Sequence, residues 1–77
     1  MKDKIHFYVG IILEDVGRLK EFISNMNEDS DQKFSVDFIN EYDDLHGYYT
    51  YHLKGYIEAY RCFLNAPFIK SLSHDEE

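Results

Sequence analysis

The chain has 77 residues, the size of one small domain with a single core. Fifteen Asp and Glu against eight Lys and Arg give a formal net charge of −7, which opposes binding to nucleic-acid phosphates and to anionic membrane surfaces. Seven Tyr, six Phe and a hydrophobic content of 44% exclude a disordered chain.

The first half of the chain predicts a strand, a helix and a second strand. Apolar side chains alternate from Lys4 to Leu13, as in a half-buried strand, and the isolated Gly10 indicates a bulge or the close approach of another backbone. Asp15 is a good N-cap for a helix that keeps one apolar stripe as far as Met26. Alternation from Phe34 then predicts a strand that ends near residue 42.

The second half predicts a hairpin followed by a helix. Residues 43–47 have turn composition, with Gly47 able to adopt a positive φ, and residues 48–54 are rich in Tyr and Thr, as strands are. A helix with one apolar face follows and ends before Pro67, because a residue that precedes proline disfavours the α region. Residues 68–72 then predict a short helical turn, and residues 73–77 a frayed acidic tail.

These elements predict an α+β fold in a single domain over residues 1–77. The order is β-α-β-β-α, with a three-stranded sheet covered on one face by two helices. An alternative is β-α-β followed by one long helix over residues 44–65, since the apolar side chains there also keep helical spacing. Gly47, Gly55 and the Tyr/Thr cluster favour the hairpin, because their helix propensity is poor.

Residues that carry catalysis or bind metals are sparse. Cys62 has no second thiol, and the histidines lack the spacing of zinc ligands: His6, His46, His52 and His74. We therefore expect no enzyme, no metal site and no cofactor. A single cysteine is typical of a reducing compartment, and the apolar run from Ile5 to Leu13 is too short to span a bilayer, so we expect a cytoplasmic protein.

Acidity is concentrated in one segment. Residues 28–44 contain seven acids and one base, Lys33. Because alternate strand residues share a face, Asp37, Glu41 and Asp43 are predicted to form a row of carboxylates on the face opposite the apolar side chains of their strand. The loop before the strand and the turn after it would extend this negative field through Glu28, Asp29, Asp31 and Asp44.

Such a row predicts a protein-binding surface. Carboxylates held on a rigid sheet can imitate phosphates, and Ile39 and Tyr48 would add apolar contacts. In size, charge and this segment, the chain resembles the small acidic proteins with which bacteriophages mimic DNA, such as the uracil-DNA glycosylase inhibitors, several anti-CRISPR proteins and the inhibitor of the nucleoid protein HU. The resemblance implies a non-catalytic inhibitor in the host cytoplasm that occupies the nucleic-acid site of HU, a polymerase or a nuclease. The alternative is a solvated face that only maintains solubility.

Two other functions stay open. Residues 11–19, Ile-Ile-Leu-Glu-Asp-Val-Gly-Arg-Leu, resemble the opening of an ACT-type regulatory domain, which implies a small-ligand sensor and a βαββαβ fold with one strand more than we predict. A plain homodimeric module is the third possibility. Two helices leave one sheet face uncovered, and that face would present His6, Tyr8, Ile12, Ile39 and Tyr48. A sheet-to-sheet or edge-to-edge dimer would cover them.

Overall fold

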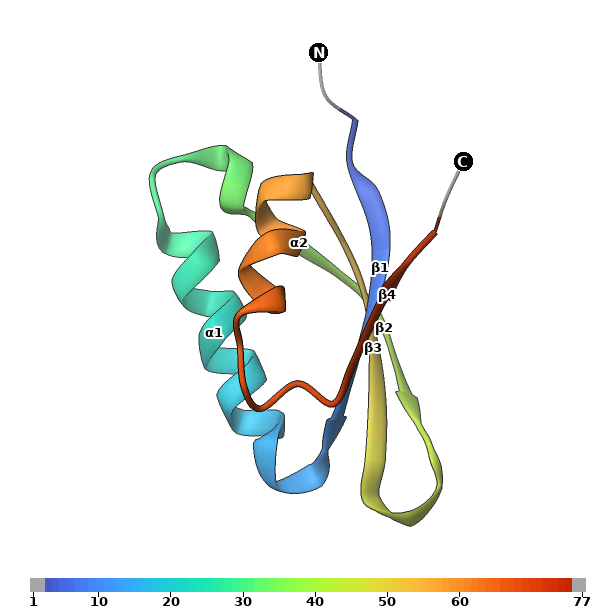
Figure 1. Cartoon of the computed structure of the whole chain (residues 1–77). Coiled ribbons are helices and arrows are strands. Elements are labelled where there is room, and N and C mark those ends of the chain that lie inside the picture. The colour runs from blue at the N-terminus through green and yellow to red at the C-terminus, as the bar shows by residue number, and fades with distance from the viewer. Residues whose placement is uncertain (1–2, 76–77) are drawn as a thin grey trace.

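The computed structural model, which describes residues 3–75, has the element order β1-α1-β2-β3-α2-β4 (Figure 1). The strands are β1 (Ile5–Ile12), β2 (Val36–Asp43), β3 (Tyr48–Gly55) and β4 (Ser71–His74), and the helices are α1 (Val16–Glu28) and α2 (Ile57–Leu64). Three short 3-10 turns connect them: η1 (Leu13–Asp15), η2 (Gln32–Phe34) and η3 (Leu45–Gly47). Within the described residues, neither helix has the length and apolarity needed to cross a membrane.

The four strands form one antiparallel sheet in the order β2-β3-β1-β4. β1 therefore lies between β3 and β4, and β2 and β4 are the two edges. This element order is that of the split βαβ, or ferredoxin-like, arrangement. Both helices pack on the same side of the sheet, and the opposite face is uncovered (Figure 1).

The core lies between the sheet and the helices. Alternate residues of the two central strands point into it, as the sequence of β1 predicts. Phe63 of α2 contacts Phe7 and Phe22, with ring centroids 5.5 Å and 5.1 Å apart. The large side chains that are fully buried are Phe7, Val9, Ile11, Leu19, Tyr51, Leu53 and Phe63.

The fourth strand corrects the predicted three-stranded sheet. β4 pairs with β1 over four residues, so a helical turn over residues 68–72 is wrong, as is a frayed tail at residues 73 and 74. Residues 76 and 77 lie outside the described part of the chain. A four-residue strand with only Leu72 as an apolar side chain has too little alternation to be recognised. Gly10 is not a bulge, and the nearest backbone atom to a Cβ there would be Ser71 N at an ordinary 3.7 Å; the close neighbour is the Ser71 side chain of β4, whose Oγ such a Cβ would meet.

The hairpin is confirmed and the long helix over residues 44–65 is wrong. His46 and Gly47 have positive φ angles of 65° and 78°, which no continuous helix accommodates. α1 ends at Glu28, two residues beyond the predicted end. Asp15 occupies the expected N-cap position but makes no capping hydrogen bond, and its carboxylate lies 3.7 Å from Arg18 instead.

Candidate partner-binding surface

The predicted row of carboxylates on β2 does not form. Phe38 pairs with Leu53 and Asn40 pairs with His52, so a bulge leaves Ile39 without an opposite residue. The extra residue shifts the alternation of β2 by one position. Asp37 stays on the uncovered face, whereas Glu41 and Asp43 share the face of the helices.

Cross-strand partners establish these orientations, because directly paired residues of an antiparallel sheet share a face. Asp37 is opposite Lys54, whose neighbours Leu53 and Gly55 are buried against the helices. Glu41 is opposite the buried Tyr51. The prediction of one continuous row over Asp37, Glu41 and Asp43 is therefore wrong.

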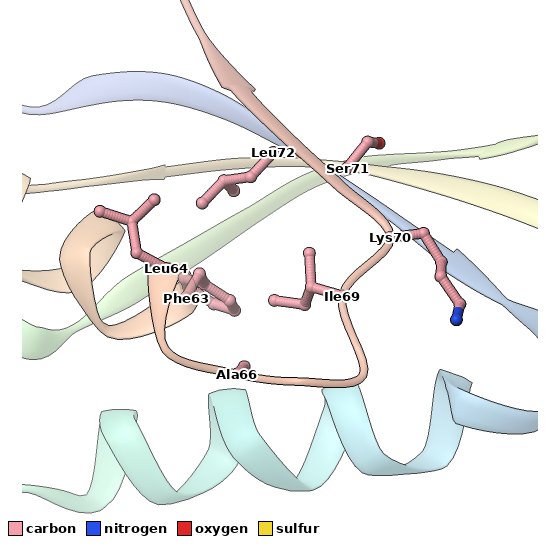
Figure 2. Close-up of a pocket in the computed structure, with 7 residues that line it drawn as sticks. All are labelled: Phe63, Leu64, Ala66, Ile69, Lys70, Ser71 and Leu72. Atoms are coloured by element: carbon pink, nitrogen blue, oxygen red, sulfur yellow. The ribbon is translucent and has the colours of Figure 1, made fainter.

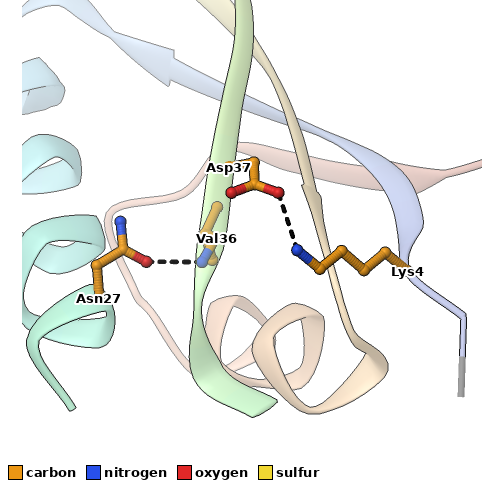
Figure 3. Close-up of polar contacts among 4 residues, drawn as sticks. All are labelled: Lys4, Asn27, Val36 and Asp37. Carbon is orange, nitrogen blue, oxygen red and sulfur yellow. Dashed lines mark hydrogen bonds and ion pairs between the residues drawn. The ribbon is translucent and has the colours of Figure 1, made fainter. Parts of the chain in front are cut away.

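Asp37 is also neutralised by a neighbouring lysine. Its carboxylate accepts a hydrogen bond from Lys4 Nζ at 3.0 Å, as Figure 3 shows. Both side chains are partly exposed, so this ion pair adds little stability. Its consequence is electrostatic, because it removes one of the predicted partner-binding charges.

The acids before β2 lie at the other end of the strand from the hairpin turn. Asp29 and Asp31 cap the local backbone through hydrogen bonds from Asp31 N–H and Lys33 N–H. Asp31 also lies 3.6 Å from the Lys33 ammonium. β2 has eight residues, so Glu28, Asp29 and Asp31 are separated from Asp43 and Asp44 by roughly 25 Å along the strand. The predicted extension of one negative field over all of these acids is wrong.

The turn between β2 and β3 is held by Asp44. Its carboxylate accepts a hydrogen bond from the Thr50 hydroxyl at 2.6 Å, and its N–H donates to the Tyr48 carbonyl at 2.9 Å. The positive φ angles of His46 and Gly47 close the turn. The end of the hairpin is therefore a defined structure with its own hydrogen bonds.

An exposed arm is the most unusual surface of the molecule. Every residue from 37 to 48 is exposed, and we call this segment the hairpin arm. It contains five of the seven large hydrophobic side chains that are exposed in the described chain: Phe38, Ile39, Tyr42, Leu45 and Tyr48. Leu45, at the turn, is 79% exposed. Five large apolar side chains exposed within twelve residues are more than scattered exposure explains, so the arm is a candidate binding surface.

The charge of the arm has one sign. It contains Asp37, Glu41, Asp43 and Asp44 and no lysine or arginine. Asp37 is paired with Lys4, whereas Glu41 and Asp43 make no ion pair with any described residue. Among the sequence-predicted residues, the structure thus gathers Glu41, Asp43, Asp44, Ile39 and Tyr48 in one arm. Sequence reasoning missed Phe38 and Leu45, although a leucine within a polar turn was an available signal.

The uncovered sheet face holds a network of aromatic and polar side chains. His6 Nδ1 lies 2.8 Å from His52 Nε2, and the Tyr8 ring stacks on His52 at a centroid distance of 4.6 Å. The Tyr8 hydroxyl donates to Asp75, and burial, followed by this hydrogen bond, raises the pKa of Tyr8. His6, Tyr8, Ile12 and Tyr48 share this face, as predicted, and Ile39 occupies the bulge beside it.

Three features concern the reactive side chains of the described residues. These residues hold no group of three or more His, Cys, Asp or Glu side chains that could bind a metal ion. Burial raises the pKa of Cys62, which disfavours the nucleophilic thiolate. Burial and then the charge of Glu41 raise the pKa of Tyr51 to about 12, so its hydroxyl stays protonated at neutral pH.

Comparisons with known proteins give no relatives: no protein-family model matches the chain, and neither a curated protein nor a solved structure matches it.

Proposed function

We propose that the protein is a non-catalytic binding module that inserts its hairpin arm into a cleft of a basic protein. The observation that carries this proposal is the arm itself. Twelve consecutive exposed residues combine five large apolar side chains with four acids on a hydrogen-bonded scaffold. Apolar anchors supply affinity when they are buried in a partner, and surrounding charges set the approach and the choice of partner.

The distribution of side chains favours a cleft over a flat surface. Phe38 and Glu41 lie on the helix side of the hairpin, whereas Tyr42 and Tyr48 lie on the uncovered side. Leu45 is at the turn between them. A flat partner would contact one of these sides only, whereas a cleft encloses both.

Charge determines the class of the partner. The arm has no base, so a complementary cleft carries Lys and Arg. Nucleic-acid-binding sites have such clefts, and HU, a polymerase or a nuclease are the first partners to test. Recognition would then depend on the apolar arm and its flanking acids instead of a phosphate-like row.

The test is a pull-down from bacterial lysate with the whole chain as bait, at low and at high salt. We expect a basic protein to be retained at low salt and to be released in part at high salt, because salt screens the exposed acids. Glu41→Lys with Asp43→Lys should lose the retained protein. Retention of nothing, or equal retention by this variant, would contradict the proposal.

A matched control changes the same amount of charge elsewhere. Glu21 and Glu28 are exposed on α1 and lie outside the arm. Glu21→Lys with Glu28→Lys therefore produces the same net charge, and it should retain the partner. Loss of the partner in both variants would mean that only net charge matters, which would exclude a specific role for the arm.

A second candidate function is a small-ligand regulatory domain of the ACT type. The observation that favours it is β4, which completes the βαββαβ order that this resemblance implies. Thermal unfolding in the presence of the twenty amino acids, one at a time, tests it. A saturable rise in the melting temperature would support a sensor, and no rise with any of them would count against one.

A further inference from the structure

The two edge strands of the sheet differ in how many backbone N–H and C=O groups remain available to pair with another strand. On β2, the Val36 N–H donates a hydrogen bond to Asn27 Oδ1 at 2.7 Å, as Figure 3 shows. The Glu41 N–H donates one to Asn40 Oδ1, also at 2.7 Å. The bulge at Ile39 and three carboxylates also obstruct this edge. These are the features by which proteins prevent an edge strand from pairing.

The β4 edge is short, at four residues, but it has no bulge, no charged side chain and no side-chain cap from a described residue on its outward N–H groups. Its residues, Ser71–His74, include no Asp, Glu, Lys or Arg. Asp75 N–H donates to the His6 carbonyl of β1 at 3.0 Å. Since backbone groups alternate in direction along an antiparallel strand, Leu72 and His74 point their N–H and C=O groups away from β1. They are available to a further strand.

A hollow with five apolar residues among the seven that line it lies directly beside this edge. It has a volume of about 160 Å³ between the end of α2 and β4. Leu72 points toward Leu64 across it, and Ser71 points away (Figure 2). Leu64 is 60% exposed although it is a leucine at the end of a core helix. A strand added to β4 would cover these apolar groups.

The distribution of charge permits a second copy of the chain at this edge. Each copy of the chain carries −7, which opposes self-association in general. The acidic arm is on β2, however, at the opposite edge from β4. In a sheet of eight strands joined through β4, the two β2 strands would be roughly 34 Å apart. That is several times the Debye length of about 8 Å at physiological ionic strength.

We propose that two copies of the chain pair through β4 about a two-fold axis, which gives a continuous eight-stranded sheet. An axis perpendicular to the sheet leaves the helix-covered faces of both copies on one side of the joined sheet. A residue of one copy is therefore opposite a residue of the second copy that lies on the same face. We place the axis at Leu72, so that Leu72 pairs with Leu72 of the second copy through their outward N–H and C=O groups and their apolar side chains meet. Ser71 lies opposite Ser73 of the second copy, on the uncovered face.

This dimer is independent of the function of the arm, and it places one arm at each end of the assembly. A partner with two clefts could then be bound at both ends, with a gain in avidity. The helices of both copies would lie on one side of the sheet and the uncovered faces on the other (Figure 1).

The register permits a charge test at two exposed serines. In Ser71→Glu with Ser73→Glu, every new carboxylate faces another one in the second copy. In Ser71→Lys with Ser73→Glu, every new charge faces its opposite. We expect sedimentation to show a dimeric parent, a dissociation constant at least tenfold higher in the first variant, and a dimer in the second. A monomeric parent, or dimers of equal strength in both variants, would overturn the proposal.

Hydrogen exchange of the unaltered chain gives a measurement that needs no variant. The amides of Leu72 and His74 should exchange more slowly as the protein concentration rises, because dimerisation buries them. The amide of Phe38, on β2, should exchange at a constant rate. If the β2 amides were protected at high concentration and the β4 amides were not, the two copies would pair through β2. That result would also overturn the proposal.

Discussion

The side chains of Asp37 and Glu41 leave β2 on opposite faces of the sheet, although a regular strand would place them on the same face. Asp37 is opposite Lys54 and Glu41 is opposite Tyr51, and the bulge at Ile39 separates the two pairs. The bulge thus replaces a one-sided acidic row by an arm with acids and apolar groups on both sides.

The start of β2 depends on Asn27 of α1. Its side-chain oxygen accepts the N–H of Val36, which is buried. Asn27→Ala should lower the free energy of unfolding by about 1–3 kcal/mol, because a buried N–H loses its partner. Urea unfolding measures this change. Asn25→Ala, at an exposed position of the same helix, should change the stability by less than about 0.5 kcal/mol. Equal effects would show that the hydrogen bond is unimportant.

Gly10 leaves space for the Ser71 side chain of β4. A methyl group there would meet Ser71 Oγ, so Gly10→Ala should destabilise the fold by about 1–3 kcal/mol. Adding Ser71→Ala should restore most of the loss, since the Ser71 Cβ would be 3.4 Å from the new methyl group. Gly17→Ala is the control. Nothing lies within 4 Å of its new Cβ, and helix propensity predicts a gain of up to about 1 kcal/mol. Thermal unfolding of the three variants distinguishes these outcomes.

The buried Tyr51 hydroxyl has no described residue in good hydrogen-bond geometry, although the Glu41 carboxylate is near enough to act on it. Burial, followed by the interaction with Glu41, raises the pKa of Tyr51 to about 12 from an ordinary 10.0. Between these pH values the unfolded chain has lost a proton that the folded chain keeps. The stability present below pH 10 is therefore lost as the pH rises toward 12. Tyr51→Phe should make this decline shallower.

At pH 7 the same substitution should be neutral or stabilising by up to about 1 kcal/mol, because it removes an unsatisfied polar group. Urea unfolding of both proteins from pH 7 to pH 11 checks both statements. A loss of more than about 1 kcal/mol at pH 7 would show that the hydroxyl has a hydrogen bond in solution.

The sequence predicts the elements that bury a periodic apolar pattern. β1, α1 and the β2–β3 hairpin follow from alternation, helical spacing and turn composition, and local propensity predicts each of them. β4 does not follow, because it is a strand only by virtue of its pairing with β1. Its one sequence signal was Gly10, which indicated the close approach of a backbone, whereas the close neighbour is the Ser71 side chain.

The candidate site is predictable in composition but not in geometry. The excess of acids near β2 is visible in the sequence, and so are Ile39 and Tyr48. The bulge is not predicted, because no glycine or proline marks it; its one trace in the sequence is the adjacent apolar pair Phe38 and Ile39, which interrupts the alternation. A single extra residue then reverses the face of every side chain after it. Lys4, far away in sequence, could not be recognised as the partner of Asp37.

The exposed side chains of the arm should matter for binding and little for stability. Leu45→Ala and Tyr48→Ala should each weaken binding to a retained partner at least tenfold, about 1.4 kcal/mol, if they are buried in the complex. Their melting temperatures should stay within a few degrees of the parent, because both side chains are exposed in the free chain. Asn25→Ala, at an exposed position of α1 outside the arm, is the control for affinity. Calorimetric titration measures the three affinities.

The most direct test of the arm is an NMR titration of the labelled chain with a purified protein retained in the pull-down. We predict that the amide signals of residues 37–48 shift or broaden together, whereas those of Glu28, Asp29 and Asp31 do not change. Shifts concentrated on the loop after α1, or spread evenly over the surface, would contradict a binding role for the arm.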